Sequence, residues 1–180
     1  MNVKATQELL PGAWRIGLNA HTDARGSFVK TYAKSVFTAQ GLAFDSVEEY
    51  YSVSKRHVVR GMHFQLPTHA HAKLVYCAVG SVRDVLLDLR KGPSYGSVAQ
   101  TILSAAEPAV LLIPEGIAHG FVSLEDGSLM VYKTSTEYAP HADAGIRWDS
   151  FGHEWQLTES PILSERDQHH PAFDDFQSQF

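Results

Sequence analysis

The sequence has little of several features that define common protein classes. It contains one cysteine, Cys77, so no internal disulfide can form, and no apolar run reaches the roughly 18 residues of a membrane helix. Basic residues are not in excess, because 15 Lys and Arg stand against 20 Asp and Glu, a net charge of −5. Net charge therefore favours neither nucleic acid nor an anionic membrane as a partner. With no signal-peptide pattern at the N-terminus, we expect a cytoplasmic protein.

The chain does contain a succession of short β-strand patterns, rich in β-branched and aromatic residues and separated by Gly, Pro, Asp and Ser. The predicted strands are 13–18, 26–32, 57–64, 73–80, 81–89, 96–104, 109–114, 118–124 and 129–138. Gly80-Ser81 predicts a hairpin. Short helices are expected at 33–41, ending at Gly41, and at 160–168, with Ser164 as a cap. The pattern predicts a single all-β domain over residues 1–180, a β-sandwich or barrel such as a jelly roll with a few short helices.

The histidines are unevenly distributed. The stretch RGMHFQLPTHAHAK, residues 60–73, holds three of the ten, and PEGIAHGF at 114–121 carries His119 at the start of a strand. The second stretch matches half of a cupin motif. The other half is incomplete, because His69 and His71 are present but no glutamate follows them. Two interpretations stay open: a metal site of three imidazoles, or an exposed loop after Pro67 that happens to contain histidine.

His63 lies within a predicted strand rather than a loop. Strand alternation predicts that it shares a face with Val59 and Gly61, while Arg60 lies on the opposite face. A histidine inside a barrel needs a hydrogen-bond partner. It is therefore either a satisfied core residue or a general base.

The segments RGMHFQ, KLVYCAVGSVRDVLLDLRKGPSYG, LLIPEGIAHGFVSL, VYKTSTEY and PILSERD, in this order and spacing, resemble the dTDP-4-dehydrorhamnose 3,5-epimerase family. The likeness runs from about Arg25 to Asp167. It implies a cupin-like jelly-roll homodimer that uses no metal and no other cofactor. It also implies epimerisation of a nucleoside-diphosphate 4-keto-6-deoxysugar at carbon 3, carbon 5 or both, in deoxysugar biosynthesis.

The resemblance also implies a role for each matching residue. His63 is the base that removes the proton beside the 4-keto group, Asp167 orients it, and Tyr132 returns a proton from the opposite face. Lys73 faces the sugar, where a cation stabilises the enolate. The residues expected to bind substrate are Arg25, Lys30, Glu48, Tyr50, Arg60, Gln65, His119, Tyr138, Asp143 and Arg166, of which the arginines at 25 and 60 suit the diphosphate.

Several positions depart from the family pattern. Lys30 stands in place of a glutamate, Glu48-Glu49-Tyr50 in place of Gln-Asp-Asn, and Tyr76 in place of an arginine. A carboxylate only accepts hydrogen bonds, so Glu48 would suit a base edge rich in donors, such as cytosine or guanine. The departures are therefore either neutral changes at the rim of a dTDP-sugar pocket, or a sign of another nucleotide, such as CDP or GDP, or of a different keto-sugar. From Glu48 we expect CDP or GDP to be preferred over dTDP.

Two other functions remain as alternatives. One is a metal-dependent cupin enzyme that uses His69, His71 and His119. The other is a sugar-nucleotide-binding cupin without catalysis.

Overall fold

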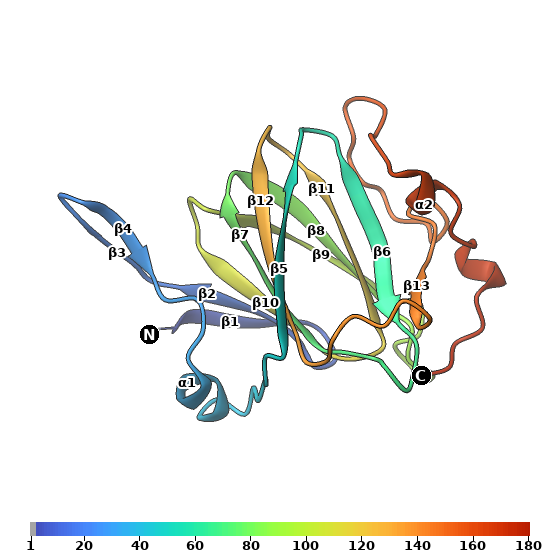
Figure 1. The fold of residues 1–180 in the computed structure, drawn as a ribbon, viewed down its shortest axis with the longest axis horizontal. Coiled ribbons are helices and arrows are strands. Elements are labelled where there is room, and N and C mark those ends of the chain that lie inside the picture. Colours follow the sequence, from blue (N-terminus) through green and yellow to red (C-terminus); the bar gives the residue numbers. More distant parts are fainter. Residues whose placement is uncertain (1–2) are drawn as a thin grey trace.

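In the computed structural model, which describes residues 3–180, two antiparallel sheets face each other as a jelly roll (Figure 1). The first has the strand order β1 (Val3–Leu10), β2 (Ala13–Leu18), β10 (Ala109–Ile113), β7 (Lys73–Val79), β12 (Ser128–Thr134) and β5 (Glu48–Ser54). The second has the order β13 (Asp143–Gly145), β6 (Val59–Gln65), β11 (Ile117–Ser123), β8 (Ser81–Asp88) and β9 (Val98–Ser104). The all-β jelly-roll prediction is confirmed.

Buried apolar side chains form three layers. Alternate residues such as Val75, Phe121 and Met130 meet between the sheets. The outer face of the five-stranded sheet is covered by the C-terminal segment from about residue 146 onward, which lies beside β6 and β13 in Figure 1. The outer face of the six-stranded sheet is covered by α1 (Lys34–Thr38) and the loop after it, through Phe37 and Phe44. Each large apolar side chain buried in this way contributes about 1.5–3 kcal/mol.

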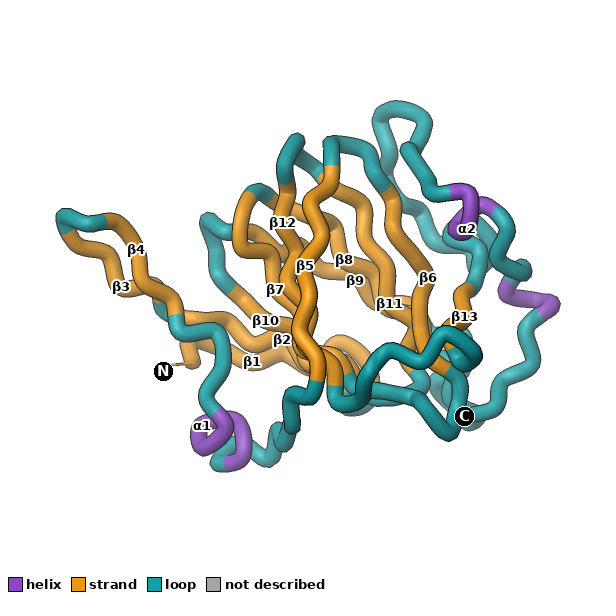
Figure 2. The backbone as a smooth tube through the Cα atoms, viewed as in Figure 1, coloured by secondary structure: helices purple, strands orange, loops and turns teal. Residues whose placement is uncertain are grey.

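Helices are short, as the tube drawing of the backbone makes plain (Figure 2). The two predicted helices are confirmed, although both are shorter than expected: α1, and α2 (Glu165–Gln168), which is followed by the 3-10 turn η1 (Phe173–Asp175). The Ser164 hydroxyl accepts a hydrogen bond from the backbone N–H of Asp167 at 3.1 Å, so the predicted cap is present. This cap fixes the first turn of α2 and with it the position of the Asp167 carboxylate.

The predicted hairpin at Gly80-Ser81 is wrong. β7 pairs with β10 and β12, whereas β8 pairs with β11 and β9, so the two strands belong to different sheets. Gly80 has a φ of 73°, and a Cβ there would lie 2.7 Å from the Ser128 Oγ. Glycine is required because the chain turns tightly against a neighbouring strand as it crosses between sheets.

The predicted faces of β6 are also partly wrong. His63 lies opposite His119 and Arg60 lies opposite Phe121, so β6 has one more residue than β11 between these pairs. An extra residue of this kind is a β-bulge, and it reverses the alternation beyond it. As a result Arg60 and His63 line the same cavity, while Val59 packs on the opposite side of the sheet.

A hairpin of β3 (Ala20–Asp23) and β4 (Gly26–Val29) projects from the body of the molecule (Figure 1). Its residues are largely exposed, including the ring of Phe28 at 62%. Within residues 3–180, no helix has the length and apolar character needed to cross a membrane.

Candidate active site

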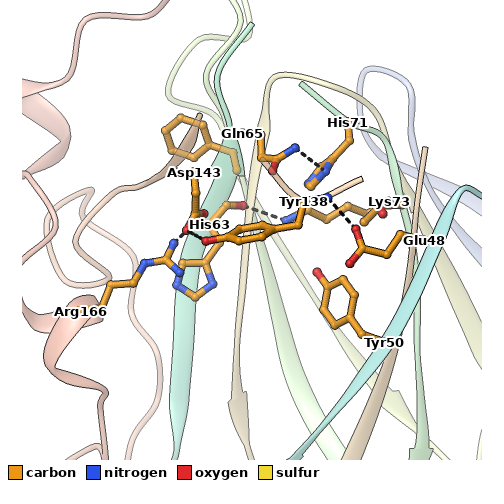
Figure 3. Close-up of a pocket in the computed structure, with 11 residues that line it drawn as sticks. Glu48, Tyr50, His63, Gln65, His71, Lys73, Tyr138, Asp143 and Arg166 are labelled. Carbon is orange, nitrogen blue, oxygen red and sulfur yellow. Dashed lines mark hydrogen bonds and ion pairs between the residues drawn. The ribbon is translucent and has the colours of Figure 1, made fainter. Parts of the chain in front are cut away.

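A polar cavity of about 350 Å³ opens beside the ends of β5, β6 and β7, and a smaller hollow of about 180 Å³ lies deeper between the sheets. Tyr50, His63 and Lys73 line both. The outer cavity also has Glu48, Gln65, His71, Tyr138, Asp143 and Arg166 in its wall (Figure 3). The inner hollow adds Ser52, Arg60, His119 and Tyr132. The volume is in the range expected for a small-molecule site.

His63 and Asp167 form a hydrogen-bonded pair at the wall of the cavity, although 104 residues separate them in the chain. The His63 Nε2 lies 2.7 Å from the Asp167 Oδ1. A carboxylate only accepts, so Nε2 carries the proton and Nδ1 is left with a free lone pair. Burial lowers the pKa of His63, and Asp167 opposes that shift. The imidazole is therefore neutral near pH 7 and able to act as a base.

Lys73 lies next to this pair. Its ammonium donates a hydrogen bond to the carbonyl oxygen of His63 at 3.0 Å, and its side chain is almost fully buried. Burial lowers the pKa of Lys73 to about 8, while the carboxylates of Asp143 and Asp84 oppose the shift. Lys73 is thus a cation at neutral pH, in a site where solvent screens its charge weakly.

Tyr132 comes from β12 on the opposite sheet. Its hydroxyl lies 3.1 Å from the Ser52 Oγ, and its ring stacks on Tyr50 at 4.8 Å between centroids. The stack follows from the register, in which Tyr132 pairs with Tyr50. Burial raises the pKa of Tyr132, so the phenol stays protonated and can donate.

His119 lies near the start of β11 and is buried in the inner hollow, where it can face a substrate as expected. Its Nε2 donates to the Asp84 Oδ2 at 2.8 Å, and both side chains are buried. Burial raises the pKa of Asp84, and His119 and Lys73 oppose that shift. The other ring nitrogen of His119 remains for a ligand.

A polar network forms the rim. The Arg166 guanidinium donates to the Asp143 Oδ1 at 2.7 Å, and the Tyr138 hydroxyl donates to the other oxygen of the same carboxylate at 3.0 Å. Glu48 accepts the backbone N–H of Tyr138 at 2.6 Å. These bonds join β5, β13 and α2 around the mouth (Figure 3).

His71 also lines the outer cavity, so only part of the exposed-loop interpretation is right. The amide of Gln65 donates to its Nδ1 at 3.2 Å, and its Nε2 is buried. Burial and the cation of Lys73 lower the pKa of His71 to about 3, so it is a neutral imidazole. Its neighbour His69 instead packs edge-on against His141, 4.5 Å away.

Two expected residues are not brought to the cavity of their own chain. Arg25 is 90% exposed at the tip of the projecting hairpin, where it pairs with Asp23, and Lys30 is exposed just after that hairpin. Ser52, in contrast, is a cavity residue that the sequence reasoning missed. Alternation from Tyr50 would have found it, but β5 was not predicted.

A metal site at the histidines would need donor atoms from at least three side chains close to one another. Among residues 3–180, the ring nitrogens of His69, His71 and His119 do not lie close enough together to hold one metal ion. The donor atoms of His63, Asp167 and His170 do lie within 4.8 Å of one another. However, two of them are already joined by the 2.7 Å hydrogen bond, which is the geometry of a proton-transfer pair rather than of a coordination shell.

The jelly roll thus encloses a hydrogen-bonded His–Asp pair, a buried cation and a protonated tyrosine, which are the groups that an acid–base enzyme needs. Residues 7–175 match the family description for dTDP-4-dehydrorhamnose 3,5-epimerase. The chain belongs to this family. Curated members include the Salmonella typhimurium enzyme, 40% identical over 84% of this chain and 85% of that one. The Mycobacterium tuberculosis enzyme is 37% identical over 96% and 89%.

Solved structures show the same fold. A Mycobacterium tuberculosis epimerase has a TM-score of 0.91 at 36% identity, covering 95% of this chain and 89% of that one. A Legionella pneumophila epimerase described in complex with dTDP-4-keto-L-rhamnose has a TM-score of 0.90 at 28% identity, covering 98% and 94%. A 3'-monoepimerase from Streptomyces bikiniensis, described with dTDP-quinovose, has a TM-score of 0.84 at 28% identity, covering 89% and 83%.

Proposed function

We propose that this enzyme epimerises a dTDP-4-keto-6-deoxysugar at carbons 3 and 5, and that it needs no metal or other cofactor. One observation carries the proposal: His63, held by Asp167, and Tyr132 come from opposite sheets and line one hollow together with the buried Lys73. A base and an acid on opposite sides of a bound ring are what inversion at carbon requires. A catalytically silent binding protein has no need of this arrangement.

The reaction balances without an external electron acceptor. The His63 Nδ1 takes the proton from the carbon beside the ketone, and the electron pair of the C–H bond moves to the 4-oxygen as an enolate. The Tyr132 hydroxyl then gives a proton to the opposite face of that carbon. Exchange with solvent returns a proton to the tyrosine and removes one from the histidine.

Lys73 and His119 have the chemistry to stabilise the enolate. Lys73 supplies a positive charge from a buried position, where electrostatic stabilisation is stronger than in water. His119 supplies a ring nitrogen at the floor of the same hollow. Both groups are held in place by hydrogen bonds before substrate binds, so little reorganisation is needed during the reaction.

We propose dTDP as the nucleotide, which reverses the expectation drawn from Glu48. That carboxylate has a bond within the protein, to the Tyr138 backbone, and lines the cavity that holds His63 and Lys73. A role in shaping the sugar pocket therefore explains it without any contact to the base. The dTDP ligands described for two of the relatives support the same choice.

The proposed reaction predicts deuterium incorporation with a defined substrate. In deuterated water, dTDP-4-keto-6-deoxyglucose is expected to gain deuterium at carbons 3 and 5, followed by NMR, at a rate that EDTA does not lower. The CDP and GDP analogues are expected to react at least about tenfold more slowly, the effect of one mismatched polar contact. Faster reaction of either analogue would restore the Glu48 interpretation, and loss of activity in EDTA would restore a metal mechanism.

We also propose that the chain acts as a single cytoplasmic catalytic domain and as a homodimer. In the dimer, the β3–β4 hairpin of each subunit reaches the cavity of its partner. The support is the position of Arg25, which the family resemblance assigns to the diphosphate but which lies on a projecting arm. The exposed aromatic ring of Phe28 on the same arm is apolar surface suited to burial in an interface.

The dimer predicts complementation between two defective variants. Arg25→Ala and His63→Ala are each expected to have little activity, but a refolded equimolar mixture should recover about a quarter of wild-type activity. Half of the dimers would then be mixed, and each would have one complete site. If native mass spectrometry shows mixed dimers but activity does not recover, Arg25 lies outside the partner's site.

A further inference from the structure

A second histidine lies against the catalytic carboxylate. His170 follows α2, and its Nε2 is 3.5 Å from the Asp167 Oδ1, the same oxygen that accepts the His63 proton. Its side chain is only 11% exposed. The His170 and His63 rings meet at an angle of 72° with centroids 5.6 Å apart. The Nε2 is buried and, within residues 3–180, makes no regular hydrogen bond, so its contact with Asp167 is electrostatic.

The fold makes room for this ring. Gly145 on β13 pairs with His63 in the sheet, and a Cβ at Gly145 would lie 2.4 Å from the His170 Nε2. Real Cβ atoms do not approach this closely. Any larger residue at 145 would therefore displace the His170 ring from Asp167. Gly145 and His170 therefore lie together beside the His63–Asp167 pair.

We propose that His170 is a positioning residue that shares the Asp167 carboxylate with His63 and thereby weakens His63 as a proton acceptor. This inference rests on the proposed role of His63 as the base. A carboxylate that serves two imidazoles stabilises a positive charge on either one less than a carboxylate that serves only one. The two ring centroids lie 5.6 Å apart, so the His170 ring also leaves less room for a positive charge on His63.

Two other cations also act on the His63–Asp167 pair. Lys73 on β7 and Arg166 on α2 face His63 and also disfavour its protonation. Arg166 is paired with Asp143 on β13, and Lys73 is bonded to the His63 carbonyl. Burial acts to raise the pKa of Asp167, but the His170 and His63 imidazoles outweigh it and hold that pKa below its usual range. Lys73 and Arg166 keep these partners when His170 is replaced, because neither of them bonds to His170.

His170→Ala is expected to raise the pKa of His63 by about one unit, the usual size of an effect from one nearby charge partner. A higher pKa keeps His63 protonated to higher pH, so the acid limb of kcat/KM moves upward. The rate at low pH falls about tenfold, while the plateau stays within about twofold. The acid limb of the kcat/KM profile is measured below pH 8, where Lys73 remains charged. A purely structural role would lower the rate at every pH without moving the limb.

Three further variants sharpen the test. His170→Gln keeps a donor but cannot become a cation, so its shift is expected to be upward and smaller. Gly145→Ala leaves His170 in the sequence but displaces its ring, so it should shift the limb in the same direction as His170→Ala. His169→Ala is the matched control, because that neighbouring histidine is exposed and bonds to the Glu165 carbonyl instead. It should leave the limb in place.

Direct NMR titration of the His63 ring in the free enzyme separates this inference from the proposed reaction, because it needs no substrate. An upward shift of the His63 pKa in His170→Ala, absent in His169→Ala, supports the shared carboxylate even if the sugar specificity proves different. An unchanged or lowered His63 pKa in His170→Ala, or an equal shift in the control, overturns it.

Discussion

Replacement of His63 by alanine is expected to abolish deuterium incorporation at every reactive carbon of the sugar. A general base contributes about 10²–10⁴-fold, and His63 is the base proposed for all exchange steps, so residual exchange should fall at least that far. Binding of dTDP should stay within several-fold, because the proposed diphosphate contacts are made by Arg60 and, in the proposed dimer, by the partner's Arg25. NMR in deuterated water measures the exchange, and calorimetry with dTDP measures the binding.

The loss must come from the imidazole and not from misfolding. His63 is half-buried at the cavity wall, so its truncation removes little apolar packing. The Asp167 carboxylate loses one hydrogen bond but keeps the Gly61 backbone N–H, so the variant should remain folded at a cost of about 1–3 kcal/mol, which thermal unfolding measures. His169→Ala serves as the control for removing a histidine from the same neighbourhood. Exchange near the wild-type rate in the His63 variant would exclude this residue as the base.

Tyr132→Phe is expected to lose epimerised product far more than it loses exchange. Phenylalanine retains the stack on Tyr50 and the filled volume, but the proton donor is gone. His63 can still remove the proton and return a deuteron to the same face, so the starting isomer becomes labelled without inversion. Product formation should fall about 10²–10⁴-fold and exchange about tenfold or less. Both quantities come from one NMR time course.

The control for this variant is Tyr51→Phe, one residue from Tyr50 on β5 but 68% exposed to solvent. It should leave both quantities unchanged. The loss of the Ser52–Tyr132 hydrogen bond in Tyr132→Phe should cost about 1 kcal/mol of stability, which thermal unfolding can detect. A parallel fall of product and exchange would remove Tyr132 from the donor role.

The sequence predicted most strands because their periodicity is local, but it missed β1, β3, β5 and β13. β5 begins with two glutamates, and most of its side chains are exposed, so apolar alternation gives no signal. β5 is held in the sheet by its pairing with β12, a segment about 80 residues further along the chain. Missing β5 also concealed the stack of Tyr50 on Tyr132 and the contact of Ser52 with the phenol.

The candidate site was accessible from sequence mainly through resemblance. Periodicity alone placed Arg60 and His63 on opposite faces, because a bulge depends on how β6 pairs with β11 and not on β6 itself. It gave no sign that Gly80 sends the chain into the other sheet. It also could not place Asp167 or His170 beside His63, since these contacts depend on the path of the whole C-terminal segment.

The C-terminal segment that covers the outer face of the five-stranded sheet also sets when the His63–Asp167 pair can form during synthesis. His63 is translated 104 residues before Asp167, which at about 5–20 residues per second is a delay of roughly 5–20 s. During that interval the outer face of the nascent sheet lacks its apolar cover, and His63 lacks Asp167. The same last stretch of chain supplies both. Translation of this stretch therefore completes the His63–Asp167 pair and covers the apolar face of the sheet at the same late stage.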